Sequence, residues 1–157
     1  MSQPKSLSRT ALSTVSADTI VSTLLTVQTS GAGFVDLTAE IAKFARDAGA
    51  REGAVALFIR HTSASLTVQE NADPTVLDDL MTALDRLTPE NAGWRHGTEG
   101  PDDMPAHVKT MLTASSLHIP ILKRELALGT WQAIYLIEHR TRPHRREIVL
   151  QFVGATG

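Results

Sequence analysis

Two strand-forming runs near the end of the chain limit its possible folds more than any other feature. They are Trp131 to Glu138 (WQAIYLIE) and Glu147 to Val153 (EIVLQFV), and a basic turn, RTRPHRR, separates them. Branched and aromatic side chains favour strands, and a short polar link with proline favours a turn. The pair therefore predicts a terminal antiparallel hairpin, which argues against a regular array of parallel strands.

The rest of the chain alternates strand-like and helix-like segments. Thr19 to Gln28 and Ala54 to Ile59 are branched, apolar runs typical of strands. Three further segments carry apolar residues at helical spacing. Their stripes are Ile41, Phe44, Ala45 and Ala48; Leu77, Leu80, Met81, Leu84 and Leu87; and Met104, Val108 and Leu112.

The second predicted helix has the clearest start. Asp73 is a residue type that caps helices, and Pro74 suits the first helical position. The third is expected to begin near Met104 or Pro105. Together these elements predict an α+β fold, with a single compact domain, a mixed or largely antiparallel β-sheet and packed helices. We expect the domain to cover residues 18–157, after a flexible N-terminal tail at residues 1–17.

The composition excludes several classes of protein. The 157 residues include no cysteine, so a disulfide framework is ruled out and any metal must bind histidine nitrogens and carboxylate oxygens. A formal net charge of −2 provides no broad basic field for nucleic acid. No apolar run is long enough to cross a bilayer, and the first residues lack the apolar core of a secretion signal. We therefore expect a cytoplasmic protein without a nucleic-acid or membrane partner.

A histidine follows the strand-like run Ala54 to Ile59. Alternation puts three aliphatic side chains and then an imidazole on one face, namely Val55, Leu57, Ile59 and His61. If the strand continues, the same face borders a polar space with Ser63, Ser65 and Thr67. The alternative is a bulge that resets the phase and leaves His61 exposed or bonded to a backbone carbonyl.

The loop and helix start at residues 95–109, RHGTEGPDDMPAHVK, hold the densest cluster of possible metal ligands. His96 and His107 lie eleven residues apart, with three acids between them, namely Glu99, Asp102 and Asp103. Imidazole and carboxylate are the ligands available to a divalent metal in a chain without cysteine. Helical spacing also places Asp103, His107 and Met111 on one face. The spacing matches no closed zinc-finger pattern, and a solvated polar loop is the alternative.

Two further stretches lie near the end of the chain, and the second has both a structural and a functional interpretation. Leu126 to Gln132 (LALGTWQ) reads as a turn in which Trp131 packs into the core. EHRTRPHRR reads either as the tip of a hairpin or as a phosphate site, because the planar guanidinium of arginine matches phosphate oxygens.

Several of these motifs in this order resemble the YjbQ family, whose members are described as secondary thiamine-phosphate synthases. The matching stretches are HTSASLTVQEN, HGTEGPDDMPAHVK, LALGTWQ and EHR followed by paired arginines, within residues 19–154. The resemblance implies a compact α+β fold, a homotrimer and a polar pocket near subunit boundaries. The chain departs from the family at Arg124 and Glu125, where the family has glycine and arginine.

The resemblance also implies an activity and roles for single residues. Thiamine-phosphate synthesis joins a pyrimidine-methyl diphosphate to a thiazole phosphate and releases pyrophosphate. We expect a divalent metal, Zn or Mg, and a small phosphorylated metabolite as partner. The metal ligands would be His61, His96 and His107, converging with Glu70 or an aspartate. The catalytic set would be Glu70, Asn71, Asp102, Asp103 and His139, and the anion-binding set Lys109, Arg140, Arg145 and Arg146.

The same residues are compatible with two other functions. One is a protein that binds a metal or a phosphorylated metabolite without turnover. The other is a hydrolase in which a histidine-held metal activates water, which requires an open coordination position. A serine triad is less attractive, because neither Ser63 nor Ser65 lies in a G-x-S-x-G motif.

Overall fold

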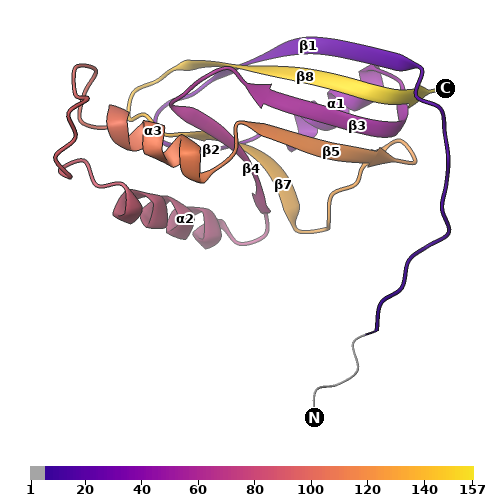
Figure 1. Cartoon of the computed structure of the whole chain (residues 1–157), viewed down its shortest axis with the longest axis horizontal. Coiled ribbons are helices and arrows are strands. Elements are labelled where there is room, and N and C mark those ends of the chain that lie inside the picture. Colours follow the sequence, from indigo (N-terminus) through magenta and orange to yellow (C-terminus); the bar gives the residue numbers. More distant parts are fainter. Residues whose placement is uncertain (1–5) are drawn as a thin grey trace.

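The chain folds into two antiparallel sheets and three helices, described for residues 6–157 by a computed structural model (Figure 1). One sheet has five strands in the order β1-β8-β3-β5-β6, and the other has three in the order β2-β7-β4. The elements in chain order are β1 (Thr19–Gln28), β2 (Gly33–Asp36), α1 (Thr38–Asp47), β3 (Ala50–Ile59), β4 (Ala64–Glu70), α2 (Pro74–Leu87), α3 (Asp103–Leu112), β5 (Ser116–Leu122), β6 (Glu125–Leu126), β7 (Gln132–Glu138) and β8 (Arg145–Thr156).

The predicted α+β class with antiparallel pairing is confirmed, but the terminal hairpin is wrong. β7 and β8 are consecutive strands that lie in different sheets. β8 pairs with β1 from Arg145 to Gly154 and with β3 on its other side, while β7 pairs with β2 and β4. Each strand thereby gains a partner on both edges, which satisfies its backbone N–H and C=O groups more fully than a two-stranded hairpin would.

The strand that ends before His61 does not continue past it, because the chain there passes from one sheet to the other. β3 ends at Ile59, and β4 begins at Ala64 in the three-stranded sheet. Residues 60–63 form the crossing, so the face of β3 does not continue into β4. Ser65 is consequently fully buried. The expected single polar face from His61 to Thr67 is therefore wrong.

The hydrophobic core draws its side chains from both sheets and from α1. It includes Ile41, Phe44 and Ala45 of α1 together with inward residues of β3, β4, β5, β7 and β8. β7 is buried along its length from Ala133 to Glu138, as expected for the central strand of its sheet. Trp131, which was expected to anchor the core, is instead 64% exposed just before β7.

The start of α2 is the one that local chemistry predicts correctly, whereas α1 begins at Thr38 without a side-chain cap. Asp73 caps α2, since its Oδ1 accepts a hydrogen bond from the N–H of Thr75 at 2.9 Å, and Pro74 is the first helical residue. α3 begins at Asp103, one residue before the expected start. α2 contains no buried residue, although its apolar residues have the helical spacing typical of a packed helix.

A strained turn marks the place where the chain departs from the family pattern. Lys123 and Arg124 link β5 to β6 with φ angles of 51° and 73°. Two central residues with positive φ are typical of a tight hairpin turn that favours glycine. The family glycine therefore corresponds to a left-handed position that Arg124 occupies here.

The segment before β1 forms no helix or strand over residues 6–18 and is exposed to solvent. Asp18 makes the first backbone contact with the sheet, donating from its N–H to the carbonyl of Gly154. The predicted tail thus lies partly in this segment and partly at residues 1–5, outside the described residues. Within residues 6–157, the three helices lack the length and apolar character needed to cross a membrane.

Candidate metal centre

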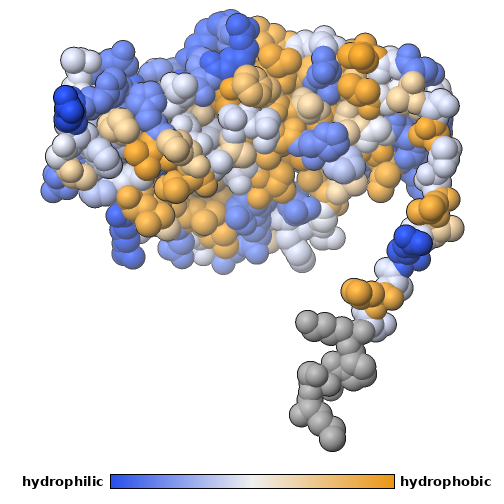
Figure 2. Space-filling view, in the orientation of Figure 1, coloured by the Kyte–Doolittle hydropathy of each residue, from blue (hydrophilic) through white to orange (hydrophobic). Residues whose placement is uncertain are grey.

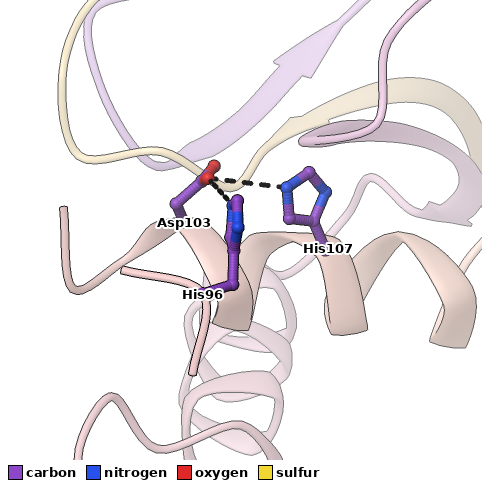
Figure 3. Close-up of side chains that lie close together, drawn as sticks. All are labelled: His96, Asp103 and His107. Carbon is purple, nitrogen blue, oxygen red and sulfur yellow. Dashed lines mark hydrogen bonds and ion pairs between the residues drawn. The ribbon is translucent and has the colours of Figure 1, made fainter. Parts of the chain in front are cut away.

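His96, Asp103 and His107 converge beside the first turns of α3 (Figure 3). One ligand atom from each residue lies within 4.8 Å of the others. The Nε2 atom of His96 is 2.7 Å from Asp103 Oδ2, and the Nε2 atom of His107 is 3.5 Å from the same oxygen. Two imidazole nitrogens therefore surround one carboxylate oxygen.

The local sequence explains how the three side chains meet. Asp103 and His107 are four residues apart on α3, so their side chains share one face. His96 comes from the preceding loop, which turns back toward the helix through Gly100. Gly100 has a φ of +114°, and a Cβ there would lie 3.1 Å from Asp102 Oδ1. Glycine is the residue that fits this position.

The hydrogen bonding of His107 prepares its Nε2 atom to bind a metal. Its Nδ1 atom is 2.8 Å from the carbonyl oxygen of Thr62. Because a carbonyl can only accept, Nδ1 carries the hydrogen of the neutral ring, and the Nε2 lone pair is free. A metal-binding histidine commonly has this arrangement, with its second nitrogen bonded to a carbonyl or carboxylate.

Arg140 holds the acidic residues of the centre in place. Its Nη1 donates to Asp103 Oδ1 at 2.8 Å, and its Nε donates to Asp102 Oδ2 at 3.0 Å. The other Asp103 oxygen, Oδ2, is the one that faces the two histidines. Burial raises the pKa of Asp102, but the hydrogen bonds from Arg140 and the Thr141 N–H outweigh it and lower that pKa to about 2. Asp102 therefore acts as an ionised anchor for Arg140.

Three of the predicted site residues do not belong to this cluster within one chain. His61 Nε2 accepts a hydrogen bond from the backbone N–H of Glu147 at 2.8 Å, so the histidine is neither a member of the cluster nor bonded to a carbonyl there. Glu70 ends β4 opposite Gln132 and Asn71 follows it, whereas Ala64 begins β4 opposite Glu138, two residues after the Thr62 carbonyl that His107 contacts. Six residues of strand separate these ends by about 20 Å. The expected convergence of His61 and Glu70 with the other histidines does not occur within the chain.

The four cations predicted to bind phosphate already have carboxylate partners. Arg140 pairs with Asp102 and Asp103, Lys109 with Asp85, and Arg146 with Glu138. These three cations are buried, while Arg145 is exposed and pairs with Glu147 at 2.6 Å. All four positive charges are thus neutralised by carboxylates of the same chain. These ion pairs give the cations a structural role.

His139 lines a cavity of about 330 Å³, together with Asp102 and Lys109. Its Nε2 is 2.8 Å from the Oγ of Ser65, and its buried Nδ1 has no hydrogen-bond partner. Burial, assisted by the charge of Lys109, lowers the pKa of His139 to about 4. The ring is therefore neutral at pH 7. Sequence reasoning missed Ser65 as its partner, because the two residues are 74 positions apart.

The donor set indicates which ions would fit the cluster. Two imidazoles and one carboxylate suit zinc or iron, and three protein ligands leave at least one coordination position open. Magnesium prefers an all-oxygen environment. Of the two metals expected from the sequence, zinc matches these side chains better. The roles of His96 and His107 as metal ligands stay a prediction.

Comparison with known proteins places the chain in a family. A family model described as UPF0047 protein YjbQ-like matches residues 23–155. A UPF0047 protein of Synechocystis is 46% identical over 132 residues, covering 83% of this chain and 90% of that protein. The UPF0047 protein YjbQ of Escherichia coli O157:H7 is 40% identical over 131 residues, covering 83% and 95%.

Solved structures agree with this assignment. A YjbQ/UPF0047 family protein from Clostridium acetobutylicum is 34% identical, with a TM-score of 0.77, covering 83% of this chain and 98% of that one. A conserved protein from Thermus thermophilus is 38% identical, with a TM-score of 0.72 and coverage of 81% and 97%. The resemblance first noted in separate motifs thus extends over sequence and fold, and the chain belongs to the YjbQ-like UPF0047 family.

Proposed function

We propose that this protein is a metal-dependent enzyme that acts on a phosphorylated metabolite in the cytoplasm, with His96, Asp103 and His107 as the metal ligands. The observation that carries the proposal is the convergence of two imidazoles on one carboxylate oxygen. The bond from His107 Nδ1 to the Thr62 carbonyl supports it, because that bond leaves the ligand nitrogen free.

The family resemblance supports a transferase of the thiamine-phosphate synthase type. In that reaction a ring nitrogen of the thiazole phosphate forms a bond to the methylene carbon of the pyrimidine. The carbon–oxygen bond to the diphosphate breaks, and its electron pair leaves with pyrophosphate. A bound divalent ion would supply positive charge to the departing group.

The protein's own residues would orient this chemistry. Arg140 fixes one oxygen of Asp103, so that the other oxygen faces the histidines. Thr62 fixes the orientation of the His107 ring through its carbonyl. Both contacts hold the ligand atoms in place before any metal binds, which lowers the ordering cost of binding.

Removal of one ligand tests the proposal. We expect His107→Ala to weaken zinc binding by roughly ten-fold or more, since removing even an outer-sphere partner costs roughly 10–100-fold in affinity. Metal content by mass spectrometry and competition with a chromophoric chelator would measure this loss. Formation of thiamine phosphate from the two precursors would fall in parallel. His118→Ala, which changes an exposed histidine on β5, is the matched control and should keep both properties.

The products distinguish the three candidate functions. Thiamine phosphate that disappears in His107→Ala supports the transferase. Release of inorganic phosphate or pyrophosphate without a coupled product supports a hydrolase, for which the open coordination position is the favourable observation. Metal binding without any product supports a binding protein. Equal metal affinity in the wild type, His107→Ala and His118→Ala would rule out this cluster as the metal centre.

We also propose that the protein is a homotrimer, as the resemblance implies. Exposed apolar side chains support an assembly, including Leu87 of α2 and Met111 and Leu112 of α3. Figure 2 shows apolar residues gathered over these two helices. Large exposed apolar patches are typical of interaction surfaces. A neighbouring copy would also be the means of bringing Glu70 and Asn71 to the metal centre.

Sedimentation equilibrium tests the assembly. We expect a mass three times the 17.0 kDa of one chain, because burying α2 against another copy removes apolar surface from water. The mass should not depend on added zinc if the interface forms without the metal. A particle with the mass of one chain at micromolar concentration would contradict the proposal.

A further inference from the structure

We infer that the hollow at the end of β3 binds the phosphate group of the substrate, with Arg60, His61 and Ser115 as donors. The hollow has a volume of about 510 Å³, and these three residues line it together with Thr62, Ser63 and Arg146. The inference rests on the proposed function in one respect, that the anion belongs to the substrate of the metal centre. It assigns His61 a role other than that of a metal ligand.

A backbone contact decides which nitrogen of His61 carries the hydrogen. The N–H of Glu147 donates to Nε2 at 2.8 Å. Since this N–H can only donate, Nε2 has no hydrogen, and the neutral ring carries its hydrogen on Nδ1. No group among residues 6–157 accepts a hydrogen bond from that Nδ1. His61, which lines the hollow, therefore has one unused donor.

The charges around the hollow favour an anion. Its lining includes two arginines and no acidic residue. Arg146 is neutralised by Glu138, but the side chain of Arg60 is 53% exposed and its Nη1 is 3.4 Å from Glu147. Arg145 also binds that carboxylate, at 2.6 Å. Arg60 thus keeps guanidinium donors for the planar, bidentate contact that phosphate accepts.

The cavity beside His139 has the opposite character. Its lining includes Asp85, Glu90 and Asp102, and the Lys109 ammonium there is paired with Asp85. Asp85 and Asp102 are paired with Lys109 and Arg140, so this lining offers a phosphate no unpaired cation, and Glu90 adds a further negative charge. The hydroxyl groups differ as well: those of Thr88 and Thr141 in the cavity beside His139 already donate to the Leu84 carbonyl and to Asp102, whereas Ser115 and Thr62 supply further donors to the hollow at β3.

The hollow adjoins the proposed metal centre through one residue. Thr62 lines the hollow, and its backbone carbonyl accepts the hydrogen bond from Nδ1 of His107. Thr110 of α3 donates to the same carbonyl at 3.3 Å. A phosphate in the hollow would therefore lie next to the segment that orients His107. A phosphorylated substrate could then reach both the hollow and the metal centre.

Titration of the metal-free protein with inorganic phosphate tests this inference. With chelator present, we expect phosphate to shift the nitrogen and hydrogen resonances of His61 Nδ1–H in the wild type. His61→Met retains a weak acceptor for the Glu147 N–H and has no donor, and Arg60→Gln removes the exposed cation. Each should weaken phosphate binding about ten-fold, in line with the loss of one charge-assisted or strong hydrogen bond.

Two controls make the outcome specific. Arg86→Gln removes the same charge from an exposed position of α2 and should leave phosphate affinity within about two-fold. Acetate should bind more weakly than phosphate. The inference is overturned if phosphate does not perturb His61 in the wild type, if Arg86→Gln weakens binding as much as Arg60→Gln, or if acetate binds more tightly. His107→Ala should lose zinc and still bind phosphate, so failure of this site and failure of the metal centre are separate results.

Discussion

Replacing Arg146 with methionine is expected to lower the free energy of unfolding by about 3–5 kcal/mol. Arg146 starts β8 and Glu138 ends β7, and both side chains are buried. The Nε of Arg146 donates to Glu138 Oε2 at 2.7 Å, and its Nη2 donates to Oε1. Burial raises the pKa of Glu138, but the hydrogen bonds from Arg146, the Arg140 N–H and Thr29 outweigh it and lower that pKa. Without Arg146, the ionised carboxylate would lose its counter-charge in a desolvated site.

The neighbouring arginine provides the matched control for this prediction. Arg145 is exposed and pairs with Glu147 on the surface, so Arg145→Met should cost no more than about 1 kcal/mol. In the double variant Glu138→Gln, Arg146→Met, the loss should shrink by at least about 1 kcal/mol relative to Arg146→Met, because this pair then leaves no unpaired charge in the interior. Urea denaturation at a single protein concentration measures all of these variants. If Arg145→Met and Arg146→Met lowered the free energy of unfolding equally, the ion pair of Arg146 with Glu138 would not stabilise the contact between the two sheets.

Acidification is expected to remove about 3 kcal/mol of stability through His139 alone between pH 6.5 and pH 4. Burial, assisted by Lys109, lowers the pKa of His139 from 6.5 to about 4. In the unfolded chain His139 therefore becomes protonated as the pH falls below 6.5, whereas in the folded chain it stays neutral until about pH 4. Unfolding is favoured as the pH falls through this window, by about 1.4 kcal/mol for each unit of pKa difference. Above pH 6.5 the effect is absent.

A variant without the imidazole isolates this contribution. His139→Gln places an amide near Ser65 and does not titrate, so its stability should fall less than that of the wild type from pH 6.5 to pH 4. The wild-type loss also includes His61, whose pKa is lowered by burial and by Arg146. His118→Gln, at an exposed position of β5, should follow the wild-type curve. Parallel curves for His139→Gln and the wild type, measured by urea denaturation with chelator present, would contradict the prediction.

The elements that the sequence predicted well are those that depend on neighbouring residues. The observed β1 has the predicted bounds, Thr19–Gln28, and α2 begins after the predicted cap at Asp73. The sequence also predicted that Asp103 and His107 share a face of α3. In each case the relevant atoms lie within a few residues of one another, so propensity and spacing describe them adequately.

The pairing of strands was predicted poorly because it depends on distant residues. Ser116 to Leu122 was not expected to form a strand, yet β5 pairs with β3 from Gly53 to Phe58. β7 and β8 follow each other in the chain but join different sheets, and no local signal distinguishes this from a hairpin. The buried ion pair between Glu138 of β7 and Arg146 of β8 was not predicted either, because the order of residues does not show which charged side chains meet in the fold.

The sequence by itself determined the family, the α+β class and the donor types available to a metal, because these follow from residue identity and order. The tertiary structure alone decided which donors meet. It joined His96 to Asp103 and His107 and directed His61 to the backbone of Glu147. It also paired the predicted phosphate-binding cations with carboxylates. Distances and desolvation, which exist only in the folded chain, select the partner of each charged group.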